Sequence, residues 1–220
     1  MQNPQAILLM GATATGKTDL AVRLSEHYPV ELISVDSALI YKDMNIGTAK
    51  PEAEILQNAP HFLIDILDPA QSWSAWSFVE QASALIREIN QRGNIPVLVG
   101  GTMMYFNALE KGLNDLPMAN DQVRSELNVR LKNDGLAVLY EELVKFDAEM
   151  AARIESTDPQ RILRAHEVFI LTGQPMSTLI KQANSRPQFN YKRIILDVLH
   201  RTELHQRIEQ RFQLMLEQGF

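Results

Sequence analysis

The sequence predicts an α/β protein in which a parallel sheet is flanked by helices and carries an inserted, all-helical lobe. Short apolar runs bounded by polar or glycine residues alternate with helical patterns through the first half of the chain, which is the rhythm of β-α-β crossovers. Residues 116–188 contain no strand-like runs, and helical patterns follow one another there. The sheet rhythm then returns. We therefore expect a core formed by residues 1–115 and 189–220, and a helical insertion formed by residues 116–188.

The individual elements follow from the period of the apolar residues. Strands are expected at 6–10, 31–35, 62–67, 95–99 and 193–199, and helices of the core at 18–27, 75–92 and from 202 to the end. Helices of the insertion are expected at 121–133, 136–146, 158–171 and 177–182. In the third of these, Asp158 is a suitable helix cap and Pro159 suits the first helical position.

Composition limits the classes of protein that remain. A chain of 220 residues with 45% hydrophobic content can bury one good core and carry a smaller lobe. The absence of cysteine excludes disulfides and thiolate metal sites. A net charge of -6 argues against broad coating by nucleic acid, so any such binding would be local. The apolar run near the start is too short for a membrane span or a signal peptide, so we expect a cytoplasmic protein that does not contact membranes.

The strongest motif lies between the first expected strand and the first expected helix. The pattern of a glycine, four residues and Gly-Lys-Thr is formed by Gly11, Ala12, Thr13, Ala14, Thr15, Gly16, Lys17 and Thr18. Such a loop directs backbone N–H groups at phosphate oxygens, its lysine adds a charge, and its threonine hydroxyl can bind Mg²⁺. The motif therefore predicts a phosphate site in a P-loop NTPase-like sheet.

Two other loops are expected to join this site. Ligands of open α/β sheets bind outside the carboxyl ends of the strands, so Gly11–Thr18, Asp36-Ser37 and Gly100–Thr102 should converge on one crevice. Asp36 could be a metal ligand, a general base or a helix cap. Beside a phosphate loop, a functional role is favoured.

The expected third helix of the insertion carries a basic face. Gln160, Arg161 and Arg164 lie together there, and this face is either a solvated surface or a binding surface.

Five segments together closely resemble the bacterial tRNA dimethylallyltransferase family over essentially the whole chain. They are GATATGKTDLA, VELISVDSALIYKDMNIGTAKP, IPVLVGGTMMYF, DPQRILRAHEVF and RTELHQRIEQRF. The second is the most specific. The resemblance implies a transferase that moves the dimethylallyl group of dimethylallyl diphosphate to N6 of the adenosine just 3′ of the anticodon. Its loop would then hold the diphosphate of a prenyl donor rather than ATP, with Mg²⁺ as the cofactor and a tRNA anticodon stem-loop as the partner.

The resemblance also implies roles for individual residues. Asp36 matches the catalytic base, Thr102 lies near the reacting centre, and Lys17 neutralises the leaving diphosphate. Arg211 is expected to reach the diphosphate together with Gly11–Thr18, although a surface helix in which it pairs with Glu209 and Glu217 is an equal alternative. The residues implied to contact tRNA are Asp36, Ser37, Ala38, Leu39, Thr102, Arg124, Gln160, Arg161, Ile162, Leu163 and Arg164.

The sequence departs from the family pattern in three places. Ala12 stands where the loop often has proline, and Asn45 stands where aspartate is expected. The chain also stops at Phe220, so it resembles a family member without its C-terminal third, and later tRNA-contacting segments are not expected in it. We expect a monomer. Two other functions stay open, namely a nucleoside or nucleotide kinase with a helical lid, and a non-catalytic fragment that binds RNA or phosphate.

Overall fold

The chain consists of two compact units in a computed structural model that describes residues 5–112, 116–182 and 189–220. The core unit contains residues 1–112 and 186–220, and the helical unit contains residues 113–185. The boundaries expected at 115/116 and 188/189 involve the segments 113–115 and 183–188, which lie outside the described residues. Among the helices described, none is long and apolar enough to cross a membrane.

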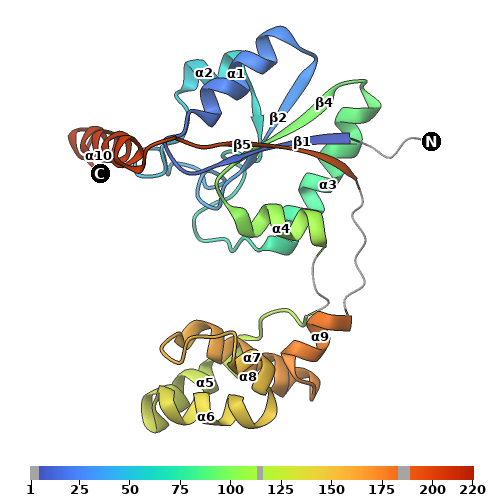
Figure 1. Cartoon of the computed structure of the whole chain (residues 1–220), viewed down its shortest axis with the longest axis vertical. Helices are drawn as coiled ribbons and strands as arrows, with labels where there is room; N and C mark the ends of the chain where they lie inside the picture. The colour runs from blue at the N-terminus through green and yellow to red at the C-terminus, as the bar shows by residue number, and fades with distance from the viewer. Residues whose placement is uncertain (1–4, 113–115, 183–188) are drawn as a thin grey trace. The chain divides into compact units, whose positions relative to one another are not determined.

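The core unit is built on a parallel sheet, as the sequence predicts (Figure 1). Within the described residues its five strands have the order β3-β2-β4-β1-β5. Their bounds are β1 Gln5–Gly11, β2 Val30–Val35, β3 His61–Phe62, β4 Ile95–Gly100 and β5 Asn190–Leu196. Each of these strands pairs in parallel with its neighbours, from β2 with β3 at one edge to β1 with β5 at the other. The carboxyl ends of these strands therefore share one edge of the sheet.

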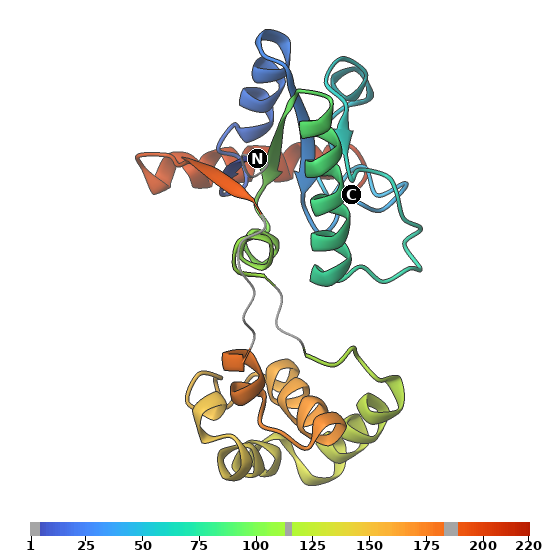
Figure 2. The same cartoon turned by 90° about the vertical axis from the view of Figure 1, so that its right-hand side faces the viewer.

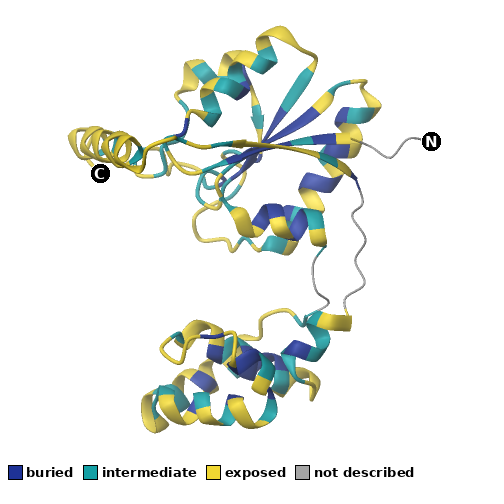
Figure 3. Cartoon of the chain, in the orientation of Figure 1, coloured by how far each residue is buried: buried dark blue, intermediate teal, exposed yellow. Residues whose placement is uncertain are grey.

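Helices cover both faces of this sheet (Figure 2). The helices of the core unit are α1 Lys17–His27, α2 Ala53–Asn58, α3 Ala75–Gln91, α4 Met103–Lys111 and α10 Arg201–Glu217. Leu8 and Leu98 pack in one cluster with residues of α3 and α4, whereas their neighbours Leu9 and Val97 pack in another cluster with Ala21 of α1. This alternation is the two-residue period of a strand that is buried on both faces. Figure 3 shows the centres of β1, β2 and β4 as the buried layer.

The chain leaves the adjacent strands β1 and β4 in opposite directions. The loop after β1 leads to α1 on one face, and the loop after β4 leads to α4 on the other face. Where the connections after two neighbouring strands lead to opposite faces of a sheet, a crevice forms between them. Ligands of such folds bind in this crevice. The fold thus places the phosphate loop at the expected binding position.

The helical unit has a separate core. Its helices, within residues 116–182, are α5 Asp121–Asp134, α6 Leu136–Phe146, α7 Ala148–Ala151, α8 Pro159–Thr172 and α9 Met176–Gln182. Leu139, Leu143 and Ile162 are fully buried in that core. The cap predicted for α8 is present, because the Asp158 side chain accepts a hydrogen bond from the N–H of Arg161 and Pro159 opens the helix.

Two expected strands differ in the structure. The strand expected at 62–67 ends at Phe62, because the backbone turns through positive φ at Leu63 (65°) and Asp65 (55°). The N–H groups of residues 65–67 then donate to the carbonyls of residues 39 and 40 instead of a neighbouring strand. The strand expected at 193–199 occupies residues 190–196, because its pairing with β1 begins at Gln5. Helices α2, α4 and α7 were not predicted from the sequence.

Candidate active site

The loop between β1 and α1 has the conformation that its sequence predicts. Gly16 adopts a left-handed conformation (φ 86°) directly before the helix, and Ala14 also has positive φ (64°). Gly11 must lack a side chain, since a Cβ there would lie 2.4 Å from the carbonyl oxygen of Leu196. The Thr15 hydroxyl is buried and donates to the carbonyl of Ala12 at 2.9 Å, which fastens the loop internally. The helix that follows presents its positive end at this loop.

Two cations converge beside the loop. Lys17 donates to the Ala12 carbonyl at 2.5 Å, while Arg211 enters from α10. Burial lowers the pKa of Lys17, the positive charge of Arg211 lowers it further, and the negative charge of Asp36 opposes the shift. Burial also lowers the pKa of Arg211, and the negative charge of Asp36 again acts to raise it. Two half-buried cations at close range favour a polyanion as the ligand, because such a ligand would relieve their repulsion.

Asp36 follows the last residue of β2 and faces the same crevice. Its Oδ1 accepts hydrogen bonds from the N–H groups of Ala38 (2.8 Å) and Leu39 (3.2 Å). These bonds fix the carboxylate in a turn of the type that aspartate favours. Neither bond uses Oδ2. The helix-cap interpretation of Asp36 is wrong, because a turn and not a helix follows it. A role in this turn is compatible with a functional role, because one oxygen can serve the turn and the other a ligand.

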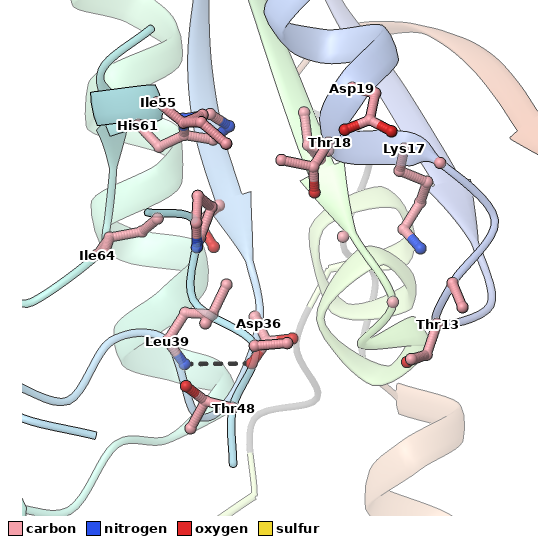
Figure 4. Close-up of a pocket in the computed structure, with 18 of the residues that line it drawn as sticks. Thr13, Lys17, Thr18, Asp19, Asp36, Leu39, Thr48, Ile55, His61 and Ile64 are labelled. Carbon is pink, nitrogen blue, oxygen red and sulfur yellow. Dashed lines mark hydrogen bonds between the residues drawn. The ribbon is translucent and has the colours of Figure 1, made fainter. Parts of the chain in front are cut away.

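These groups line one cleft of about 380 Å³ at the carboxyl edge of the sheet. Figure 4 shows Lys17 on one side of it and Asp36 on the other. The lining residues are Thr13, Ala14, Gly16, Lys17, Thr18, Asp19, Ser34, Asp36, Leu39, Thr48, Ala49, Pro51, Ile55, His61, Ile64, Val99, Gly100, Gly101, Arg207 and Arg211. The cleft thus has a cationic side at the loop and α10, and a more apolar side that includes Ile55 and Ile64. It suits a small molecule with an anionic head and an apolar tail.

Comparison with known proteins identifies the family. Residues 39–220 match the family model described as IPP transferase. A tRNA dimethylallyltransferase of Legionella pneumophila (strain Philadelphia 1) is 52% identical over 218 residues, which is 99% of this chain and 70% of that relative. The chain belongs to the tRNA dimethylallyltransferase family. Members of this family are transferases, so the enzyme class expected from the sequence is confirmed.

Solved structures of the family support this assignment. The tRNA isopentenylpyrophosphate transferase of Bacillus halodurans is 36% identical, with a TM-score of 0.62, and the match covers 98% of this chain and 67% of that one. A eukaryotic dimethylallyltransferase described as acting on tRNA is 27% identical, with a TM-score of 0.80, and the match covers 98% of this chain and 53% of that one. The family resemblance therefore extends to the fold of nearly the whole chain.

The structure of this family member brings together part of the expected donor site. The expected residues that line the cleft are Thr13, Ala14, Gly16, Lys17, Thr18, Asp36, Leu39 and Arg211. Those outside its lining are Gly11, Ala12, Thr15, Ser37, Ala38 and Thr102. Thr102 nevertheless lies beside the end of β2, because its N–H donates to the carbonyl of Val35 at 3.3 Å. Among the described residues, no carboxylate lies within 4.0 Å of the Arg211 guanidinium, so the alternative pairing with Glu209 or Glu217 is not found.

Other residues of the cleft were missed from the sequence. Arg207 lies one helical turn before Arg211, and its Nη1 is 3.5 Å from the carbonyl of Ala14. The spacing of four between these arginines is the signal that could have found it. His61 also lines the cleft; burial lowers its pKa, and its Nδ1 lies 2.7 Å from the carbonyl of Ala59. Thr48 reaches the cleft from a loop without a recognisable motif.

The residues expected to contact tRNA through the helical unit have different environments. Arg161 is well exposed and lies 3.4 Å from Asp158, whereas Arg164 is largely buried in an ion pair with Glu167. Ile162 has no exposed surface, so its side chain cannot contact tRNA, and the prediction for it is corrected. Its apolar side chain packs in the core because α8 turns that face inward. Leu163 is half-buried against the same core, and Gln160 is exposed.

The donor set beside the loop fits a magnesium ion. The Thr18 hydroxyl supplies a hard oxygen atom to the cleft, and the Asp36 carboxylate adds a negative charge to the same cleft. Mg²⁺ usually takes few ligands from the protein and completes its coordination with water and phosphate oxygens. The described residues contain no group of three or more acidic or histidine side chains that could form a protein-only metal site. A metal here would therefore be shared with the phosphates of a ligand.

The lowered pKa of Lys17 gives a pH prediction for anion binding. The amine must be charged to attract a diphosphate, so affinity should fall as pH rises through a value below the ordinary 10.5. A bound diphosphate should raise the pKa again, so binding near this pH should take up protons. Calorimetry of inorganic pyrophosphate binding in buffers with different ionisation enthalpies would measure the uptake. An equal uptake by Lys17→Met would contradict the assignment of the titrating group to Lys17.

Proposed function

We propose that this protein transfers the dimethylallyl group of dimethylallyl diphosphate to N6 of the adenosine just 3′ of the anticodon in tRNA. The main support is the placement of a cationic phosphate loop and a strand-end carboxylate, Asp36, around a single cleft. The names of the relatives support the transfer of a dimethylallyl group to tRNA. Phosphate loops serve many reactions, whereas a carboxylate opposite the loop suits a transfer in which a proton must be removed from the acceptor.

The donor is expected to bind through its diphosphate. The amides of Gly11–Thr18, the amine of Lys17 and the guanidinium of Arg211 would hold its oxygens. The bond between C1 of the allyl group and the bridging oxygen then breaks, and its electron pair leaves with the diphosphate. Because negative charge grows on those oxygens as the bond breaks, the two cations stabilise the transition state more than the bound donor. The leaving group is therefore assigned to the loop side of the cleft.

The acceptor amine is expected to approach from the opposite side. The lone pair of N6 forms the new bond to C1, and the nitrogen then carries one proton too many. Asp36 accepts that proton, so its carboxylate becomes a neutral carboxylic acid and the prenylated N6 of the product is left uncharged. Since Oδ1 already accepts two backbone hydrogen bonds, Oδ2 is the oxygen that we assign to the proton. The free products are the prenylated tRNA and diphosphate.

Magnesium is proposed as the cofactor, with the Thr18 hydroxyl as its ligand from the loop. When bound, Mg²⁺ supplies positive charge that helps to neutralise the diphosphate. Asp36 is close enough to the two cations to influence their pKa values, so its carboxylate would also keep the cationic side electrostatically balanced before the donor binds.

The tRNA is expected to offer its target base outside the anticodon stack. An enzyme that modifies a base atom must reach that atom, and unstacking exposes it. Because the whole chain is acidic, the RNA must be bound by local groups. We assign this role to Asp36–Leu39 beside the cleft and to exposed polar residues of the helical unit, with Arg124, Gln160 and Arg161 among them. We also propose that the protein works as a monomer in the cytoplasm.

Mass spectrometry of a synthetic anticodon stem-loop tests the proposed function. Incubation with the protein, Mg²⁺ and dimethylallyl diphosphate should add the mass of C5H8 to the RNA. A stem-loop with guanosine in place of the target adenosine should stay unmodified, and ATP in place of the donor should not be consumed. Consumption of ATP with phosphorylation of a nucleoside would support a kinase instead. Binding of the stem-loop without any mass change would indicate a non-catalytic protein.

A further inference from the structure

A buried carboxylate joins two helices of the helical unit. The side chain of Glu167, on α8, is only 1% exposed. Its Oε1 accepts hydrogen bonds from the N–H of Asn120 at 2.8 Å and from Nε of Arg124 at 3.1 Å, and its Oε2 accepts from Nη1 of Arg164 at 2.5 Å. A buried charge requires such partners, because few other groups can replace its lost hydration. We call these three side chains, Arg124, Arg164 and Glu167, the Glu167 clamp.

The two arginines of the Glu167 clamp are used differently. Arg164 is 27% exposed, and both of its terminal nitrogens are engaged, Nη1 with Glu167 and Nη2 with the carbonyl of Pro117 at 2.6 Å. Arg124 is 52% exposed and donates to Glu167 only through Nε. Within the described part of the chain, its Nη1 and Nη2 make no hydrogen bond to protein. The guanidinium of Arg124 is thus anchored at one edge and open at the other.

An arginine anchored through Nε is well prepared to bind a phosphate. Its two terminal nitrogens can donate in parallel to two oxygens of one anion, which is the geometry that distinguishes arginine from lysine. Because Glu167 already fixes the side chain, less conformational entropy is lost when the anion binds. Arg161, at the start of α8, is a further exposed cation of the helical unit, and its Nε lies 3.4 Å from Oδ2 of Asp158. RNA backbone phosphates are the anions that the proposed substrate offers.

We infer that Glu167 is a positioning residue for tRNA binding, holding Arg124 so that its terminal nitrogens bind a backbone phosphate while Arg164 closes the clamp without contacting RNA. This inference rests on the proposed function. Glu167 was not among the site residues expected from the sequence. The inference also changes the role of Arg164, which was expected to contact tRNA and is now assigned to support Glu167. Burial alone would raise the pKa of Glu167, but the hydrogen bonds and the two arginines outweigh it and lower that pKa. The Glu167 carboxylate therefore stays charged at the neutral pH at which tRNA would be bound.

Four variants of the full chain separate positioning from stability. Arg124→Ala removes the proposed phosphate contact and leaves Glu167 paired with Arg164. Glu167→Gln keeps the size of the side chain but removes the charge that orients Arg124. Arg164→Ala removes the support. Glu142→Gln is the control for the loss of a carboxylate charge, because Glu142 forms an ion pair with Arg130 in the same unit, at 2.7 Å, outside the Glu167 clamp and with 36% of its side chain exposed.

Affinity for the anticodon stem-loop at several salt concentrations is the main measurement, with thermal unfolding and pyrophosphate affinity as companions. Arg124→Ala should lower RNA affinity by about tenfold and reduce the slope of log affinity against log salt by about 1, because one phosphate contact is lost. Glu167→Gln should also lower RNA affinity, as Arg124→Ala does, when it is measured at a temperature at which the variant is folded. Arg164→Ala should mainly lower the unfolding temperature. Glu142→Gln should leave RNA affinity unchanged, and pyrophosphate affinity should be the same in all four.

Several results would overturn the inference. Wild-type RNA affinity and salt slope in Arg124→Ala would do so, as would an equal loss of RNA affinity in Glu142→Gln. So would a smaller salt slope in Arg164→Ala without a change in unfolding temperature, because Arg164 would then be the phosphate contact. Failure of the wild-type protein itself to bind or prenylate the stem-loop would overturn the proposed function as well. A wild-type protein that is active and indifferent to Arg124 overturns the inference alone.

Discussion

Replacing Asp36 with alanine is expected to lower kcat for prenyl transfer by about 10²- to 10⁴-fold, which is the usual contribution of a positioned proton acceptor. Donor affinity should stay within a few-fold of wild type, because the phosphate loop and Lys17 do not depend on the carboxylate for their fold. Steady-state kinetics with the stem-loop as acceptor and calorimetry with inorganic pyrophosphate would measure the two effects separately.

Asp36→Asn is the matched control for this prediction. An asparagine retains a side-chain oxygen that can accept the hydrogen bonds now made by the N–H groups of Ala38 and Leu39. It should therefore preserve the turn and lose the base, so its kcat should fall about as far as that of Asp36→Ala. Activity close to wild type in Asp36→Asn would show that Asp36 serves the turn. Equal losses of donor affinity and kcat in both variants would instead indicate a metal ligand.

Replacing Lys17 with methionine is expected to weaken donor binding and to slow transfer together. The removed charge is useful in the bound state and more useful as the diphosphate leaves, so kcat should fall by about 10²- to 10³-fold. The unbranched methionine keeps most of the apolar stem, which limits changes in packing. The dissociation constant of pyrophosphate and the single-turnover rate of transfer are the two quantities to compare.

A second variant shows whether the effect of Lys17 is specific to the donor. Arg211→Gln should have the same kind of effect, because Arg211 lies close enough to Lys17 to lower its pKa. Arg92→Gln is a suitable control, because Arg92 is paired with Glu31 at 2.7 Å and does not line the cleft. A Lys17 variant that lost ATP binding but transferred prenyl groups at the normal rate would contradict the assignment of the loop to the donor.

Much of the fold could be predicted because its signals are local. Buried parallel strands leave short apolar runs, and helices leave a period near 3.6, so both can be recognised without knowing their partners. The phosphate loop is equally local, since its glycines and its lysine lie within eight residues and its strand and helix flank it directly. Helix α6 even has the bounds expected from the sequence.

The misplaced elements depended on distant partners. Residues 62–67 have the composition of a buried strand, yet their backbone hydrogen bonds go to the carbonyls of Leu39 and Ile40, more than twenty residues earlier. The bounds of β5 were set by its pairing with β1, at the other end of the chain. Short helices such as α7 carry too few residues to show a period.

The site was predictable where chemistry is tied to a motif, and unpredictable where it depends on tertiary pairing. Asp36 could be named as a candidate from its position after a strand, but the structure was needed to show that its Oδ1 accepts hydrogen bonds within a turn and that no helix follows it. The roles of Arg124 and Arg164 could not be separated from the sequence, because Glu167 lies 43 residues beyond Arg124 and only 3 beyond Arg164. The sequence identifies these arginines but does not show which of them are already paired with a carboxylate in the folded protein.

The crystal structure of the protein with Mg²⁺ and a dimethylallyl diphosphate analogue tests the central claim most directly. In the analogue, sulfur replaces the oxygen that bridges the allyl group and the phosphorus, so that the donor stays intact. The account predicts the diphosphate on the loop Gly11–Thr18, with Lys17 and Arg211 in contact with its oxygens and the allyl carbon directed toward Asp36. A diphosphate bound outside this loop, or an allyl group directed away from Asp36, would contradict the account.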